Sequence, residues 1–189
     1  MYFKQIQEII DGTKTQTRRI VKPGERFLFD DDDHEHIVLD PNNRLKWQVG
    51  RDYAVSPGRG LPGVLWQPGY NTYYMRHEGI WIPSMWKGDI YVPDYTRYEL
   101  ERKGWEPLRI VITAIRREAL QDISPEDVRA EGIWCDVDHD PLDIGFSRDL
   151  HNQDVYRQLW NDINTRKGTR WEDNPDVWVI EFEVVRDAS

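Results

Sequence analysis

The chain is 189 residues long and carries 34 acidic against 25 basic side chains, which gives a net charge of −9 at neutral pH. This balance argues against a protein that coats nucleic acid through a broad basic surface. The length suits one domain. The single cysteine, the lack of a signal-peptide run at residues 1–5 and the absence of a roughly 20-residue apolar segment lead us to expect a cytoplasmic protein that does not enter a membrane.

A short helix followed by a polar stretch opens the chain. Phe3, Ile6, Ile9 and Ile10 recur at helical spacing, and Gly12 is placed to end this helix in a left-handed conformation. The next seven residues are Thr13, Lys14, Thr15, Gln16, Thr17, Arg18 and Arg19. Dense sets of such donors bind phosphates and nucleobase edges. The alternative is a solvated turn that leads into a basic edge strand.

Positive charge is concentrated in the same part of the chain. Residues 13–26 contain two lysines and three arginines, and Glu25 is the only acidic residue among them. A local basic site in an acidic chain suits a small anionic ligand or one short strand better than a long duplex.

Short strands are expected next, at 20–21, at 45–49 and more weakly at 52–55, with a turn at 40–43. Arg59 then lies between two glycines, where the backbone can approach a ligand closely. A flexible turn explains the same glycines equally well.

Two runs rich in aspartate and histidine, at residues 30–36 and 136–140, contain metal-ligating side chains. The adjacent residues of the first run seldom converge on one ion, and the second run lacks the glycine and terminal glutamate of a calcium loop. We interpret both as loops and expect no metal and no cofactor.

Residues 61–107 read as an insertion rich in Pro, Gly, Trp and Tyr, with one strand at 87–92 and a short helical turn at 99–102. Clustered aromatic side chains can stack on bases. The interpretation that we prefer is a small local core that anchors the insertion to the rest of the domain.

The clearest helix start lies at Ser124, with Pro125 as the first helical residue and Asp127 completing an S-x-x-D capping box. Gly132 is placed to end this helix, which leaves Glu131 at its C-terminal edge. The helix dipole disfavours a negative charge there, which suits a proton-shuttling acid.

The strongest strand patterns are at 109–115 and 177–185, and an amphipathic helix is expected at 150–163. Several strands with few helices predict an α+β fold. The two strong strands should be central, with the Ser124 helix packed at one end.

Several stretches, which occur in the expected order and cover most of the chain, resemble the ASCH domains of the PUA-like superfamily, most closely the longer versions of phages and prophages. These stretches are G-x-K-T-x-T-x-R at residues 12–19, and residues 49–55, 109–118, 122–132 and 178–182. The resemblance implies a small mixed PUA-like β-barrel with two or three flanking helices, formed here by residues 1–189 as one domain with its insertion at about 61–107.

The resemblance also implies a possible chemistry. Some small bacterial ASCH proteins are amidohydrolases that remove the acetyl group from acetylated cytidine, and their catalytic lysine, threonine and glutamate match Lys14, Thr17 and Glu131. Thr17 would attack, Lys14 would act as the base, and Glu131 would transfer the proton. In a regular strand Lys14 and Thr17 would point to opposite faces, so the site requires a turn or bulge at residues 13–16.

PUA-like domains also bind RNA or a modified base without chemistry, and some ASCH proteins are ribonucleases. In the binding interpretation Lys14, Arg18 and Arg19 contact phosphate, while Gln16 and Glu131 contact base edges. Thr15 and Arg59 are further candidate ligand-binding residues. We expect RNA, a nucleotide or a modified nucleoside as the partner, with binding as the first hypothesis and amide or phosphodiester hydrolysis as the alternatives that the sequence leaves open.

Overall fold

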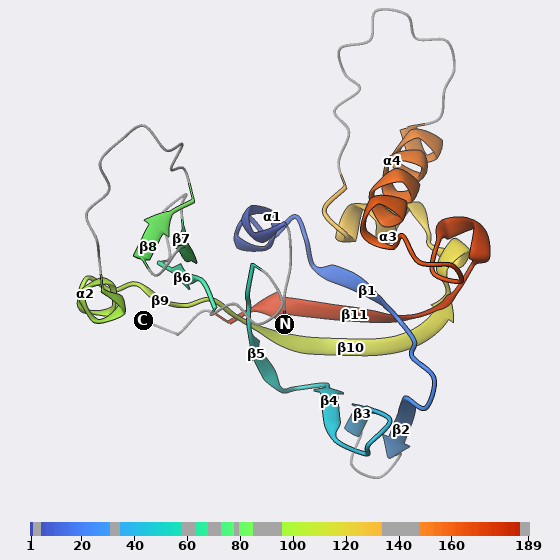
Figure 1. Ribbon diagram of the computed structural model, residues 1–189, viewed down its shortest axis with the longest axis horizontal. Helices are drawn as coiled ribbons and strands as arrows, with labels where there is room; N and C mark the ends of the chain where they lie inside the picture. The colour runs from blue at the N-terminus through green and yellow to red at the C-terminus, as the bar shows by residue number, and fades with distance from the viewer. Residues whose placement is uncertain are drawn as a thin grey trace, which may run out of the picture.

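Two long antiparallel strands form the centre of the protein, seen in a computed structural model that describes residues 1, 5–30, 35–57, 63–67, 73–77, 80–84, 96–133 and 148–185. These strands are β10 (Arg109–Ala119) and β11 (Asp176–Val184). They lie inside a four-stranded sheet of order β1-β11-β10-β5, completed by β1 (Gln16–Ile20) and β5 (Asp52–Ala54). The sheet is curled (Figure 1), and the predicted central position of the two strongest strand patterns is confirmed.

The central sheet is covered on both faces where β11 begins. On one face Trp178 and Ile180 pack with Ile112 and with Val38 of a second sheet. That sheet has the order β2-β3-β4, made of β2 (Arg26–Asp30), β3 (Glu35–Leu39) and β4 (Leu45–Gln48). On the other face Val177 and Val179 pack under the helices α3 (Pro125–Ala130) and α4 (Arg148–Ile163). The alternating residues of β11 are therefore buried on both sides.

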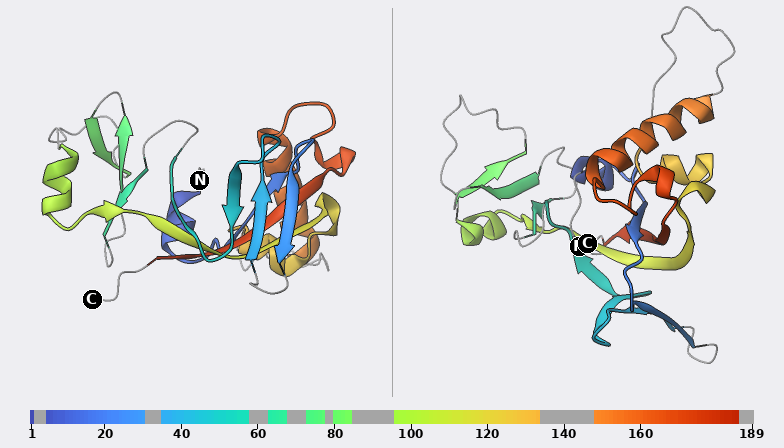
Figure 2. Two further views of the ribbon diagram at one scale, coloured as in Figure 1. Left: turned by 90° about the horizontal axis from the view of Figure 1, so that it is seen from below. Right: turned by 45° about the vertical axis from the view of Figure 1, so that its right-hand side comes forward.

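A third sheet accounts for most of the described part of the predicted insertion, in the order β8-β7-β6-β9. Its strands are β6 (Leu65–Trp66), β7 (Tyr73–His77), β8 (Ile80–Pro83) and β9 (Glu106–Pro107), and α2 (Arg97–Arg102) lies beside them. Figure 2 shows this lobe at the end of the molecule where β10 begins. The sequence indicated α2 but missed β6, β7 and β8, because strands this short show little periodicity; the expected strand at 87–92 lies outside the described residues.

The aromatic residues of this lobe form a small core of their own. Trp81, Trp105, Leu65 and Leu100 are buried together, with the Tyr74 ring edge-on to Trp105 at 4.8 Å between centroids. Two neighbouring residues, Val64 and Trp66, pack instead with Ile6, Ile9 and Ile10 of α1 (Ile6–Ile10) and with Phe182. The lobe is thus attached to the central sheet through an apolar contact with the first helix.

The observed architecture is α+β, with a curled antiparallel sheet and few helices. The remaining elements are two short 3-10 helices, η1 (Leu120–Asp122) and η2 (Trp171–Asp173). In the part of the chain that the structure describes, no helix is both long enough and apolar enough to cross a membrane.

Candidate functional site

Lys14 and Glu131 meet because the chain is irregular just before β1. Gly12 ends α1 with a positive φ of 77°, and the amide of Lys14 donates to the carbonyl of Glu8 at 2.8 Å. The Thr15 amide then donates to Ala130 O at 2.8 Å, and Lys14 forms an isolated antiparallel bridge with Glu131. Regular strand geometry begins only at Gln16. Lys14 therefore lies outside the regular strand, in which alternating side chains would point Lys14 and Thr17 to opposite faces.

The helix α3 presents Glu131 from the other side. The Ser124 hydroxyl accepts a hydrogen bond from the Asp127 amide at 3.1 Å, and Pro125 is the first helical residue, as predicted. The reciprocal half of the predicted capping box is wrong. The Asp127 carboxylate does not return to Ser124 but accepts hydrogen bonds from Gln16 Nε2 at 2.9 Å and from Arg18 Nη2 at 2.8 Å. A cationic donor such as Arg18 binds a carboxylate more strongly than the neutral backbone amide of Ser124 would, which explains why Asp127 does not complete the capping box.

Gly132 ends α3 with φ of 78°, and a Cβ at this position would lie 3.0 Å from Lys14 Cβ. We expect Gly132→Ala to destabilise the protein more than Gly12→Ala. Both variants incur the left-handed strain of about 1–2 kcal/mol. Among the described residues nothing lies within 4 Å of a Cβ at position 12, so Gly12→Ala is a matched control without the clash. Urea denaturation of both variants measures the difference in their free energies of unfolding. Equal decreases relative to the wild type would contradict the close packing of Gly132 on Lys14.

The contact between Lys14 and Glu131 is a buried ion pair. Lys14 Nζ lies 2.7 Å from Glu131 Oε2 and also donates to the Glu131 backbone carbonyl at 2.6 Å, and the two residues are only 4% and 6% exposed. Burial lowers the pKa of the Lys14 amine below its usual value, although the charge of Glu131 opposes this shift. No described group donates a hydrogen bond to the other carboxylate oxygen, Oε1, which is buried and lies 3.7 Å from Arg18 Nη1.

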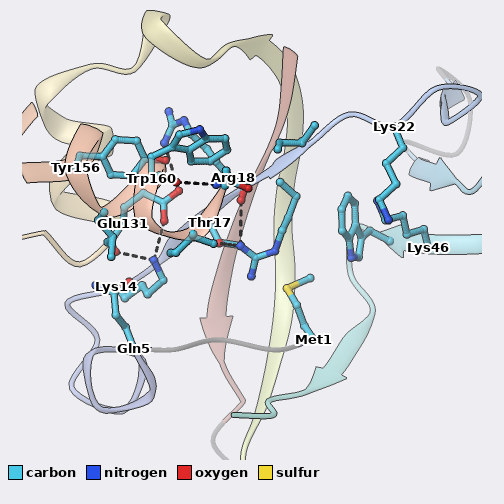
Figure 3. A pocket seen from close by; sticks show the side chains of 16 residues that line it. Met1, Gln5, Lys14, Thr17, Arg18, Lys22, Lys46, Glu131, Tyr156 and Trp160 are labelled. Atoms are coloured by element: carbon cyan, nitrogen blue, oxygen red, sulfur yellow. Dashed lines mark hydrogen bonds and ion pairs between the residues drawn. The ribbon is translucent and has the colours of Figure 1, made fainter. Parts of the chain in front are cut away.

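A cavity of about 410 Å³ opens beside this pair. The three residues predicted to act together, Lys14, Thr17 and Glu131, all line it, and Figure 3 shows them at one end. The Thr17 hydroxyl accepts a hydrogen bond from Arg19 Nη1 at 2.8 Å. The remaining lining residues are Met1, Gln5, Arg18, Arg19, Ile20, Lys22, Lys46, Trp47, Tyr156, Leu159, Trp160, Ile163 and Asn164.

Arg18 does not lie at the rim of the cavity, where Arg18 or Arg19 was expected. Its side chain is fully buried, with Nη2 2.6 Å from Glu118 Oε1 and 2.8 Å from Asp127 Oδ2. Its Nη1 donates to Gln16 Oε1 at 2.5 Å. The guanidinium is thus committed to internal carboxylates and holds the wall of the cavity in place.

The other predicted ligand-binding residues are distributed differently. Arg19 is half-buried and lines the cavity. Gln16 is buried and binds Asp127 and Arg18, and Thr15 is exposed; neither lines the cavity. Arg59 lies outside the described residues.

The aromatic walls of the cavity come from elements that sequence analysis did not assign to the site. Tyr156 and Trp160 are one turn apart on α4, and Trp47 lies on β4. Burial raises the pKa of the Tyr156 hydroxyl well above its usual value, and the charge of Glu131 adds to this effect, so the hydroxyl remains protonated. The helical spacing of Tyr156 and Trp160 was visible in the sequence, but it also fits an ordinary apolar face.

Within the described residues no group of three or more His, Cys, Asp or Glu side chains is arranged to hold a metal ion. Most of the run at 30–36 and all of the run at 136–140 lie outside those residues. Comparison of the chain with protein-family models, with curated proteins and with solved structures finds no match.

Proposed function

We propose that the protein binds a nucleotide or a modified nucleoside, free or as part of RNA, in the cavity between β1 and α4. The observation that carries the proposal is the composition of this cavity: a hydrogen-bonding pair at one end, aromatic walls, and several cationic side chains. Its volume of about 410 Å³ falls within the range of ligand pockets, which is about 300–1,000 Å³. We further propose a PUA-like barrel of the ASCH type as the fold, on the strength of the sequence resemblance and the curled sheet.

The Lys14–Glu131 pair suits a base edge. Glu131 Oε2 is bound to Lys14, whereas Oε1 is a buried acceptor with no described donor. An unsatisfied buried carboxylate oxygen is costly, so an N–H group of a ligand would be bound favourably there. An ammonium has three donors and Lys14 uses two of them on Glu131, which leaves one for an acceptor on the same edge.

The aromatic side chains provide the stacking surface. Tyr156 and Trp160 lie on α4 above the Lys14–Glu131 pair, as Figure 3 shows. The Trp47 ring also lines the cavity, with its centroid 3.8 Å from Lys46 Nζ. Stacking on aromatic side chains combined with hydrogen bonds to base edges is the usual way in which proteins hold an unpaired base.

Calorimetric titration with cytidine, acetylcytidine, cytidine monophosphate and a short single-stranded RNA tests the proposal. Ile163 lines the cavity and is 47% exposed, so Ile163→Trp should fill the cavity without disturbing the core and should weaken binding about tenfold or more. The matched control is Gln158→Trp, at an exposed position of α4 that does not line the cavity, and its affinity should be unchanged. If the wild-type protein binds none of these ligands, the proposal is wrong.

A second candidate function, hydrolysis of an acylated cytidine amide, is favoured by the short hydrogen bond between Lys14 and Glu131 beside the Thr17 hydroxyl. Transfer of one proton along that bond converts an ammonium and a carboxylate into a neutral amine and a carboxylic acid. The pair then supplies a base and an acid together, and burial of Lys14 favours its neutral form.

The proposed hydrolysis begins with attack of Thr17 on the acyl carbon. Lys14 takes the Thr17 proton while Oγ1 bonds to the acyl carbon, and Glu131 gives its proton to the leaving nitrogen as the C–N bond breaks. Water then releases the carboxylic acid and restores the Thr17 hydroxyl. The Arg19 guanidinium, hydrogen-bonded to Thr17 Oγ1, would stabilise the charge that develops on that oxygen.

A further inference from the structure

The end of the cavity opposite the Lys14–Glu131 pair carries a group of cationic side chains. Lys22 and Lys46 line this end, as Figure 3 shows, and Arg19 also lines the cavity. Lys22 follows β1 and is exposed, while the Lys46 side chain on β4 is 23% exposed. Arg19 and Lys46 lie on strands of two different sheets, and Lys22 lies in the connection after β1, so only the tertiary structure brings them together.

Glu25 neutralises only part of this charge. Its Oε1 lies 2.6 Å from Lys46 Nζ, and its Oε2 accepts hydrogen bonds from Trp178 Nε1 at 2.8 Å and from the Lys22 backbone amide at 3.1 Å. Among the described groups at this end of the cavity, two lysines therefore lie beside one carboxylate whose two oxygens are both engaged, and the charge of Arg19 also acts on Lys46. The result is a local excess of positive charge in a chain whose net charge is −9.

The cations are close enough to repel one another. The pKa of the Lys46 amine is lowered, chiefly by burial, and the charges of Lys22 and Arg19 add to that effect while Glu25 opposes it. Lys46 Nζ also lies 3.8 Å from the centroid of the Trp47 ring, which fixes the amine beside an aromatic wall of the cavity. A bound anion would relieve this repulsion, because it interacts favourably with all three cations.

We propose that Lys22 and Lys46, assisted by the charge of Arg19, form a phosphate-binding subsite at this end of the cavity, so that the ligand is phosphorylated and lies with its base at the Lys14–Glu131 end. This inference rests on the proposed function. Of the ligands proposed there, it favours a nucleotide over a free nucleoside. Of the side chains first expected to contact phosphate, Arg18 and Lys14 are committed to buried carboxylates. Lys22 and Lys46 take their place beside Arg19.

The test compares the affinities of cytidine, cytidine 5′-monophosphate and a trinucleotide without terminal phosphates. We expect the wild-type protein to bind the monophosphate about tenfold or more tightly than cytidine at low salt, with a smaller difference at high salt. Lys22→Ala should reduce the affinity for the monophosphate severalfold and leave that for cytidine unchanged. Lys46→Ala should act in the same direction, and Lys22→Ala remains decisive if the loss of the ion pair with Glu25 unfolds that variant.

Lys103→Ala is the charge-matched control, since Lys103 is exposed at the end of α2 and does not line the cavity. A Lys22 dependence seen with the trinucleotide but not with the monophosphate would also support the subsite and would identify the phosphate as a phosphodiester of a strand. Equal binding of cytidine and both phosphorylated ligands, with no effect of Lys22→Ala, would overturn the subsite while leaving the proposed cavity function intact. Binding of none of the three would refute the proposed function itself.

Discussion

Replacement of Arg18 by methionine is expected to lower the free energy of unfolding by about 3–5 kcal/mol. The Arg18 side chain is fully buried against Glu118 and Asp127, and Glu131 Oε1 lies 3.7 Å away. Removing one member of a buried ion-pair network leaves the remaining charges uncompensated in a region of low dielectric. Urea denaturation at neutral pH measures the loss.

Arg116→Met is the matched control for this experiment. Arg116 contacts the same two carboxylates, with Nη2 2.9 Å from Asp127 Oδ2 and Nε 3.1 Å from Glu118 Oε2, but its side chain is 39% exposed. Because solvent screens exposed ion pairs, Arg116→Met should lower the free energy of unfolding by no more than about 1 kcal/mol. If Arg18→Met lowers the free energy of unfolding no more than Arg116→Met does, burial does not explain the contribution of the Arg18 contacts to stability.

The decrease in the free energy of unfolding caused by Arg18→Met should depend on pH. Burial opposes ionisation of Asp127, but the hydrogen bond from Gln16 and the charges of Arg18 and Arg116 lower its pKa below the ordinary value of 3.8. A carboxylate with a lowered folded-state pKa stabilises the fold above its unfolded-state pKa, and this stabilisation disappears as the pH falls through the folded-state value. The difference between wild type and Arg18→Met should therefore be largest near neutral pH and should narrow below about pH 4.

Thr17→Ala is expected to abolish acetate release from acetylcytidine while leaving ligand affinity nearly unchanged, if the protein is a hydrolase. The substitution removes only the attacking hydroxyl, so the effect should fall on kcat and not on binding. Thr17→Ser keeps a hydroxyl and should retain turnover. A Thr17→Ala variant with full activity would exclude Thr17 as the nucleophile.

In the same assay Glu131→Gln should lower turnover and flatten one limb of the pH–rate profile, because an amide cannot transfer a proton. Lys14→Ala should damage binding as well as turnover, since it removes both a base and a cationic ligand. If the wild-type protein binds nucleotides but releases no acetate at any pH, the hydrolase candidate is wrong and the binding proposal stands.

Local sequence signals determined a large part of this structure. Gly12 and Ser124 set helix boundaries through backbone conformation and a side-chain cap, which depend only on neighbouring residues. The patterns at 109–115 and 177–185 identified the central strands, because long β-branched runs have few alternatives. The polar stretch after Gly12 also singled out Lys14 and Thr17, which do line the cavity.

Only the tertiary structure decided which of the polar residues face the cavity. Gln16 and Arg18 were as promising in sequence as Arg19, but the carboxylates of Asp127 and Glu118 engage them, and that contact joins residues about a hundred positions apart. The cavity instead takes Lys46 and Trp47 from one sheet and Tyr156 and Trp160 from a helix. No local pattern encodes such a convergence, because it depends on how the curled sheet brings distant elements together and on which charges become buried in the process.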